Sequence, residues 1–202
     1  MDDDKLQSLR LPGMLLAGAA LVAVVLMHHH PHGGDGAGLI RSVHGALSAM
    51  IVIQAAVMIL VARALGWSFH VALGLAFFVL GICGALVAGS INGFVVPALL
   101  DYPASDIGSG TFELAWELNQ QFARNGAVAV GTGIAFFGLS LWRAGWRLTG
   151  AVGLIAGLVP AALLIAGAID MRFYGAMFTY ISQLSWLILL GLMLARGARR
   201  TG

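Results

Sequence analysis

Six long apolar stretches are the feature that most constrains what this chain can become. They cover residues 11–27, 39–65, 69–100, 126–142, 148–169 and 175–194. A helix needs about 20 apolar residues to cross the hydrocarbon core of a bilayer. Only 10% of the 202 residues are charged, which is too few to cover the surface of a water-soluble fold. We therefore predict an all-α integral membrane protein, a compact bundle of six transmembrane helices.

The basic residues predict how this bundle is oriented, because Lys and Arg in short loops accumulate on the cytoplasmic side of a membrane. With both termini cytoplasmic, eight basic residues lie inside and three lie outside. The inside set is Lys5, Arg10, Arg63, Arg143, Arg147, Arg196, Arg199 and Arg200, and the outside set is Arg41, Arg124 and Arg172. We expect a multi-pass protein of a bacterial-type inner (plasma) membrane, with its functional face outward.

This orientation divides the chain into three parts. Residues 1–10 form a cytoplasmic N-terminal segment, residues 11–196 the six-helix membrane domain and residues 197–202 a basic cytoplasmic tail. The first five residues, MDDDK, resemble the end of an epitope or protease tag, so no fold argument uses them.

Small residues recur every four positions in two of the stretches, as Ala85, Gly89 and Gly93 and as Gly153, Gly157 and Ala161. Small residues let helix backbones approach closely in lipid, so both ladders predict tight packing rather than a wide pore. A bend is expected near Gly93 and Pro97, and a kink at Pro160.

A histidine cluster is the strongest chemical signal at the predicted outer end. The segment HHHPH holds His28, His29, His30 and His32, and His44 lies near the start of the next helix. Imidazole is a common ligand of Zn, Cu and Fe. The predicted ligands are His28, His30, His32 and His44, with carboxylates from Glu113 and Asp170, and haem b is a second possibility. The alternative is that these imidazoles only contact water and lipid head groups.

Residues 111–125 carry a second polar group. Glu113, Glu117, Gln120, Gln121 and Arg124 fall on one face of a helix. One interpretation is a helix in the membrane interface with a solvated stripe. In the other the stripe turns inward, with Glu117 as general base or ligand, and Arg124 holding an anionic substrate group or pairing with the glutamate.

A third polar group lies deeper in the predicted membrane. Its members are Ser48, Gln54, Ser90, Asn92, Thr179, Tyr180, Ser182 and Gln183. They either form hydrogen bonds between packed helices or line the floor of an outward-facing pocket. In the second case Asn92 and Tyr180 would contact a ligand.

Three functions are compatible with these patterns. The first is a metal- or haem-dependent membrane enzyme, hydrolytic or redox. The second is a transporter or sensor that binds a small ligand in an outward-facing cavity. The third is an accessory subunit that docks on a larger membrane complex. Expected partners are membrane lipid, a small-molecule or lipid-like substrate and a partner membrane subunit. Nucleic acid is not expected, because the basic residues form no single patch.

Overall fold

The computed structural model describes residues 7–29, 36–103, 107–108 and 110–197, and this part of the chain is helical without strands. Its elements are α2 (Arg10–His28), α3 (Ala37–Leu65), α4 (Phe69–Ser90), the π-helical turn η1 (Ile91–Val95), α5 (Val96–Leu99), α6 (Thr111–Arg143), α7 (Arg147–Ile165) and α8 (Phe173–Arg196). Six helices in the described residues are long and apolar enough to cross a membrane, α4, η1 and α5 counting as one. The predicted number of candidate spans is therefore confirmed.

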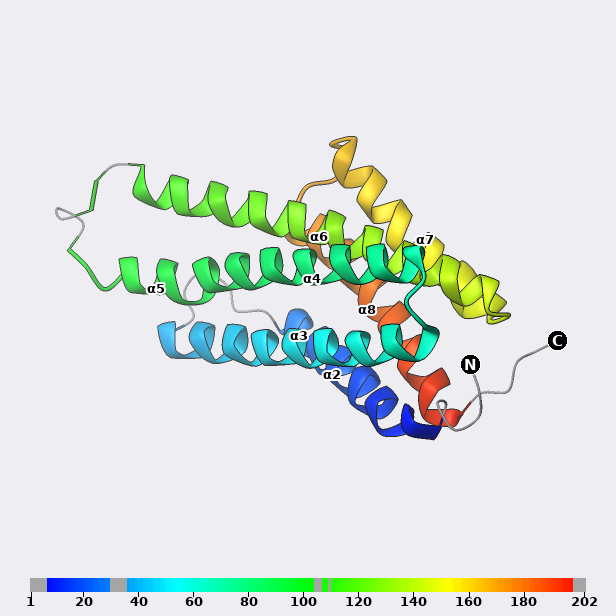
Figure 1. Ribbon diagram of the computed structural model, residues 1–202. Helices are drawn as coiled ribbons and strands as arrows, with labels where there is room; N and C mark the ends of the chain where they lie inside the picture. Colours follow the sequence, from blue (N-terminus) through cyan, green and yellow to red (C-terminus); the bar gives the residue numbers. More distant parts are fainter. Residues whose placement is uncertain (1–6, 30–35, 104–106, 109, 198–202) are drawn as a thin grey trace.

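The helices form a closed ring (Figure 1). Each spanning helix packs against the next one along the chain, and α2 packs against α8. We call the end where α2 begins and α8 ends the terminal end, and the end where α3, α6 and α8 begin the loop end. At the loop end α3, α4–α5 and α6 extend beyond the other three helices. This arrangement leaves an interior that side chains must fill.

Glycines set the spacing of three of the helix pairs. A Cβ would lie 2.5 Å from Val130 N at Gly81, 2.3 Å from Gly131 O at Gly157 and 2.7 Å from Gly191 O at Gly13. These sites join α4 to α6, α6 to α7 and α2 to α8. Because the facing atoms are backbone, only a residue without a Cβ allows this approach.

Of the two predicted small-residue ladders, the one on α7 makes the expected close contacts. Gly153 and Gly157 on α7 lie against neighbouring helices as expected. On α4 the close contacts are made instead by Gly81 and Gly84, whereas a Cβ at Gly89 would meet nothing within 4 Å. Of the predicted ladder on α4, Gly89 therefore faces open space, whereas Gly93 lies directly against His44 and a Cβ at Gly126 of α6 would lie 3.0 Å from Ala85 N.

The expected bend near Pro97 takes the form of η1. Proline has no N–H to donate within the helix, and the π-helical turn directly precedes it. Gly93 in this turn lies directly against His44 of α3. Pro160 lies inside α7, which remains one helix from Arg147 to Ile165.

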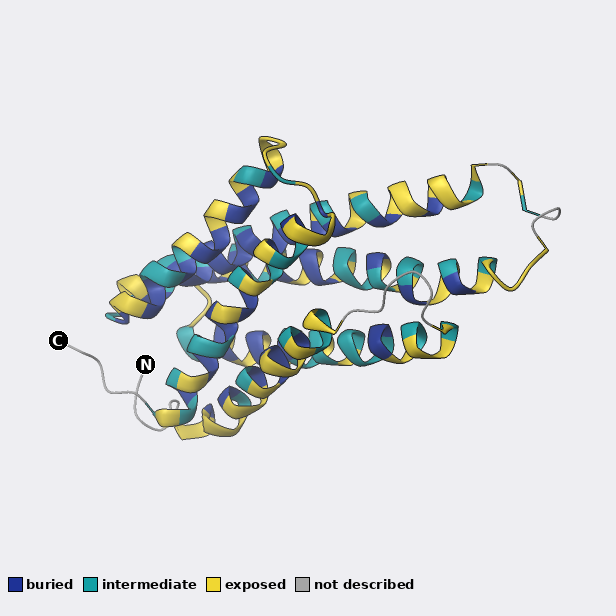
Figure 2. Ribbon diagram, turned by 180° about the vertical axis from the view of Figure 1, so that it is seen from behind, coloured by how far each residue is buried: buried dark blue, intermediate teal, exposed yellow. Residues whose placement is uncertain are grey.

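A hydrophobic core fills the ring toward the terminal end. Phe78, Phe137 and Trp186 are completely buried there. The indole Nε1 of Trp186 donates to Thr149 O at 3.0 Å, so the one polar atom of this large side chain has a hydrogen-bond partner. In Figure 2 the buried residues lie on the sides of the helices that face one another. Buried side chains therefore fill the interior of this half of the bundle.

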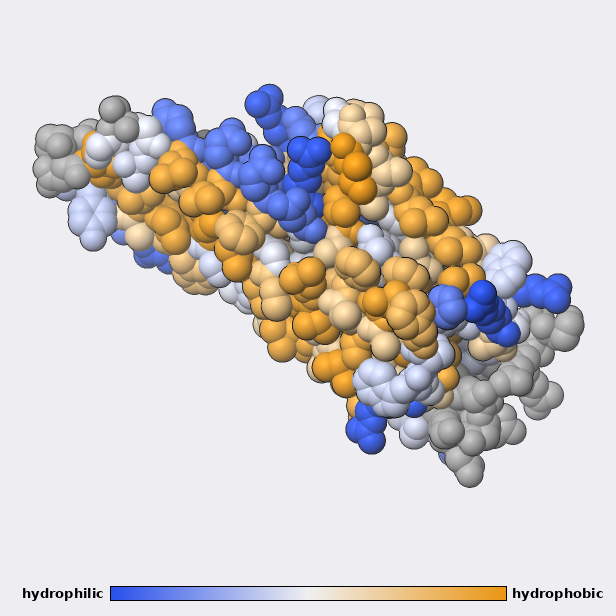
Figure 3. Space-filling model, turned by 45° about the horizontal axis from the view of Figure 1, so that its top comes forward, coloured by the Kyte–Doolittle hydropathy of each residue, from blue (hydrophilic) through white to orange (hydrophobic). Residues whose placement is uncertain are grey.

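The outside of the bundle is largely apolar. Figure 3 shows hydrophobic surface over most of the helices, with hydrophilic side chains near the terminal end and in a strip that runs from the loop end to about the middle of this face. Leu80, Ile155 and Ile165, for example, are each more than 60% exposed on their helices. Such an apolar surface is expected of a chain surrounded by lipid.

Candidate ligand cavity

The loop-end half of the ring encloses a cavity of about 590 Å³. Its walls come from α2, α3, α4 with η1 and α5, α6 and α8. Along α3 it reaches from Ile40 to Gln54, about 21 Å at 1.5 Å per residue. The cavity is therefore long and lies along the helices.

Residue sizes on two helices explain why this space is open. The inward side of α3 carries His44, Leu47, Ser48, Ile51 and Gln54, and α4 contributes Ala85, Ala88 and Gly89. The α3 positions recur at the three- and four-residue spacing of one helix face. Because the α4 side chains are so small, they do not reach across the gap.

His44 and Asn92 form a polar pair in the wall of the cavity. His44 is only 5% exposed, and its Nδ1 lies 2.9 Å from Ile40 O. A carbonyl carries no proton, so Nδ1 donates. Asn92 Nδ2 lies 3.3 Å from Nε2 and donates to it, so both ring nitrogens of His44 have a hydrogen-bond partner. Gly93, next to Asn92, allows the close approach.

Three more polar residues lie at the deep end of the cavity, namely Gln54, Tyr180 and Gln183. Gln183 Nε2 donates to Ala127 O at 2.8 Å and so joins α8 to α6. Gln54 Nε2 is buried and has no hydrogen-bond partner among the residues the structure describes. Members of the deep polar group thus do both: Gln183 and Asn92 form hydrogen bonds to other helices and also line the cavity, and Tyr180 lines it as well.

The polar stripe on the 111–125 segment does not turn inward as a whole: its two glutamates are exposed, as in the interpretation of a solvated stripe, whereas Gln120 lines the cavity. This segment is the first part of α6, and the residues it buries are Ala115, Asn119 and Ala123. Glu113 and Glu117 are exposed instead, and Figure 3 shows hydrophilic surface along this part of α6. Trp116, Asn119 and Gln120 are the α6 residues that reach the rim of the cavity.

Arg124 has a structural contact in place of the predicted catalytic one. Its Nη2 donates to Leu164 O at 2.7 Å. Leu164 is one of the last residues of α7, and its carbonyl oxygen also accepts from Gly167 N at 3.2 Å, so the guanidinium adds a second hydrogen bond at the C-terminal end of this helix. Glu117 and Arg124 therefore form no shared site with the cavity.

Among the residues that the structure describes, the predicted metal ligands are not brought together. His30 and His32 lie outside the described residues, and His28 is exposed at the end of α2. No group of three His, Cys, Asp or Glu side chains among the described residues could hold a metal ion. The metal-binding prediction therefore has no support from the structure.

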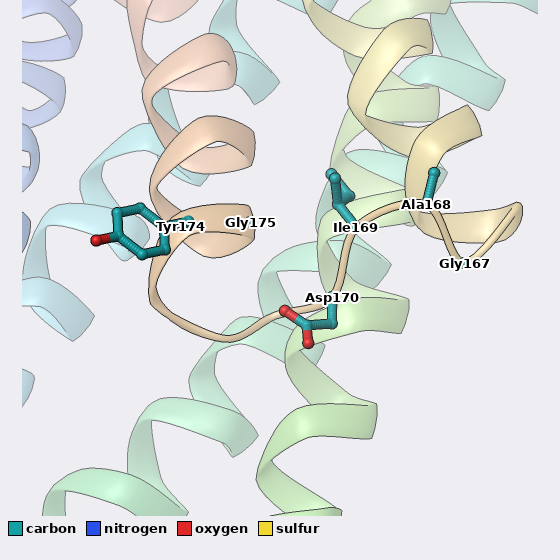
Figure 4. Close-up of a pocket in the computed structure, with 6 residues that line it drawn as sticks. All are labelled: Gly167, Ala168, Ile169, Asp170, Tyr174 and Gly175. Atoms are coloured by element: carbon teal, nitrogen blue, oxygen red, sulfur yellow. The ribbon is translucent and has the colours of Figure 1, made fainter.

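Asp170, the other predicted carboxylate ligand, lies in a shallow pocket between α7 and α8 (Figure 4). The pocket has a volume of about 310 Å³, and Gly167, Ala168, Ile169, Tyr174 and Gly175 complete its lining. The Asp170 carboxylate accepts from Arg172 N at 3.0 Å and pairs with its guanidinium at 3.5 Å. In Figure 4 the Tyr174 ring points away from Asp170. With its carboxylate already engaged, this pocket is a weaker candidate than the large cavity.

Comparison with protein-family models, curated protein sequences and solved structures finds no match. The residues that line the cavity are therefore the basis for a functional proposal.

Proposed function

We propose that this protein binds a small lipid-like molecule in the cavity between its helices and acts as a membrane receptor or sensor. The observation that carries this proposal is an apolar cavity of about 590 Å³ with a few polar groups in its wall. Small-molecule sites have volumes of about 300–1,000 Å³ and this same mixed character.

The composition of the wall supports a lipid-like ligand. Leu47, Ile51, Ile82 and Leu184 offer aliphatic contact along the cavity. An alkyl or polycyclic body would gain about 25 cal/mol for each Å² of apolar surface that it buries there. Polar groups in such a wall fix the orientation of a ligand rather than supply most of its affinity.

Two features of the bundle favour ligand binding over transport and over metal catalysis. The fully buried side chains of Phe78, Phe137 and Trp186 occupy the ring on the terminal side of the cavity, so a ligand has no open route through it. The Nε2 lone pair of His44, which a metal or haem iron would need, accepts from Asn92.

Saturable photolabelling tests this proposal. A diazirine-bearing fatty acid methyl ester is added to the protein in lipid nanodiscs, illuminated, and its adducts are mapped by peptide mass spectrometry. We expect saturable labelling at Leu47 and Ile51, which line the cavity, and competition by excess unlabelled methyl ester. Val52 is 54% exposed on α3 and should label in proportion to probe concentration, without competition. If Leu47 and Ile51 behave like Val52, the cavity is not a ligand site.

We also propose that the terminal end faces the cytoplasm and that the cavity opens outward. Arg10, Arg63, Arg143, Arg147 and Arg196 lie in the first or last turn of their helices at the terminal end. This concentration follows the bias of cytoplasmic loops toward basic residues.

Cysteine labelling of intact cells checks the orientation. In a Cys83→Ser background, Gly108→Cys should react with a membrane-impermeant maleimide added outside, because Gly108 is exposed before α6. Trp67→Cys is the matched variant, 66% exposed in the α3–α4 connection, and should react only after permeabilisation. The reverse pattern would reverse the assignment of sides.

A further inference from the structure

We propose that the ligand presents a neutral carbonyl-type oxygen to the side-chain amide of Gln54 at the deep end of the cavity. The inference deepens the proposed function and rests on it. Gln54 lines the cavity and is 3% exposed. Its Nε2 is buried without a hydrogen-bond partner in the described part of the chain.

An amide donor in this position calls for an acceptor. Removing an amide from water without a new hydrogen bond is unfavourable, and at membrane depth lipid offers no replacement. Gln183 is the informative contrast, because it is equally buried in the same cavity but its Nε2 donates to Ala127 O at 2.8 Å. The fold thus satisfies one of these two amides and leaves the other for a molecule that enters.

The position of Gln54 defines how the ligand lies. Gln54 follows His44 by ten residues on α3, about 15 Å along the helix. The His44–Asn92 pair is already hydrogen-bonded, whereas Gln54 Nε2 is not. The acceptor oxygen therefore lies deep, and the apolar body extends past Ile51 and Leu47 toward the rim.

The acceptor is neutral because of where the charges lie. Of the described residues that line the cavity, only Arg172 carries a formal charge, and it belongs to the rim at the start of α8. An ionised carboxylate beside Gln54 would be desolvated with no described cation to compensate it. The ligand class is accordingly a lipid-like ketone, aldehyde, ester or quinone.

Two probes of equal chain length test the inference. Methyl undecyl ketone and tridecane differ only in the carbonyl, and each competes with the diazirine methyl ester for labelling at Ile51. Concentrations are expressed as mole fraction in the nanodisc, so that partitioning into lipid does not bias the comparison. In the wild type we expect the ketone to compete about tenfold more effectively than the alkane, the usual effect of one hydrogen bond.

Two variants separate recognition by Gln54 from the general removal of a buried polar group. Gln54→Leu should abolish the advantage of the ketone, because leucine has no donor. Thr179→Val is the matched control: Thr179 Oγ1 is also buried and without a partner in the described residues, but Thr179 does not line the cavity. This variant should keep the advantage.

The outcomes that overturn the inference are specific. It is wrong if Gln54→Leu retains the preference for the ketone, or if Thr179→Val loses it to the same degree. Equal competition by both probes in a wild type that still shows saturable labelling would remove the role of Gln54 and leave cavity binding intact. Absence of saturable labelling in the wild type would remove both proposals.

Discussion

Gly89→Leu is expected to leave the protein folded and to reduce saturable photolabelling at Ile51 at least tenfold. A Cβ at Gly89 meets no heavy atom within 4 Å, so the new side chain enters open space. That space is the cavity, which Gly89 lines. Leucine also has a higher helix propensity than glycine, which is about 0.8–1 kcal/mol less favourable in a helix than alanine, the best helix former. The thermal unfolding temperature should therefore be equal to that of the wild type or higher.

Gly18→Leu is the matched control for this experiment. Gly18 is also a helical glycine whose Cβ would meet nothing within 4 Å, but it is exposed on α2 and does not line the cavity. This variant should fold and keep wild-type labelling at Ile51. If Gly89→Leu folds and keeps saturable labelling as well, the ligand binds elsewhere.

Gly157→Ala is expected to destabilise the bundle by about 2 kcal/mol, the usual cost of overpacking a close contact. A Cβ at Gly157 would lie 2.3 Å from Gly131 O and 2.9 Å from Ala135 N. Both atoms belong to the backbone of α6, so neither can rotate away and the two helices must separate. A lower unfolding temperature in nanodiscs, by about 4–8 °C, measures this effect.

Gly18→Ala and Gly89→Ala show whether the loss is specific to the helix contact. Both glycines have open space at the Cβ position, so alanine should be neutral or slightly stabilising at either site. An unfolding temperature of Gly157→Ala that equals the wild type would mean that α6 and α7 are not in backbone contact at this point.

Hydropathy predicted the candidate spans well because it reflects how favourably each side chain transfers from water to an apolar environment. Five of the six apolar stretches agree with helices of the structure to within a few residues. The exception is the stretch 126–142, which is only the second part of α6, Thr111–Arg143. Its first part is too polar to count as a span, yet backbone hydrogen bonding continues through it regardless of side-chain polarity.

The direction in which side chains face was harder to predict. On α6 the polar stripe with Glu113 and Glu117 was a plausible inward face, but the bundle buries the side with Ala115 and Asn119. Polar side chains can turn toward solvent or toward a cavity, and periodicity alone does not distinguish the two. The smaller side of the helix packs inward because α4 lies close to it.

What the sequence by itself determined is the number of candidate spans. Only the tertiary structure decided which small residues pack against a neighbour and which leave space. A Cβ at Gly81 would contact the backbone of α6, whereas a Cβ at Gly89 would have no atom within 4 Å. The tertiary structure alone distinguished Gln183, which is hydrogen-bonded, from Gln54, which is not. The physical reason is that hydropathy belongs to one residue, whereas a contact or a cavity depends on residues of different helices that the chain brings together.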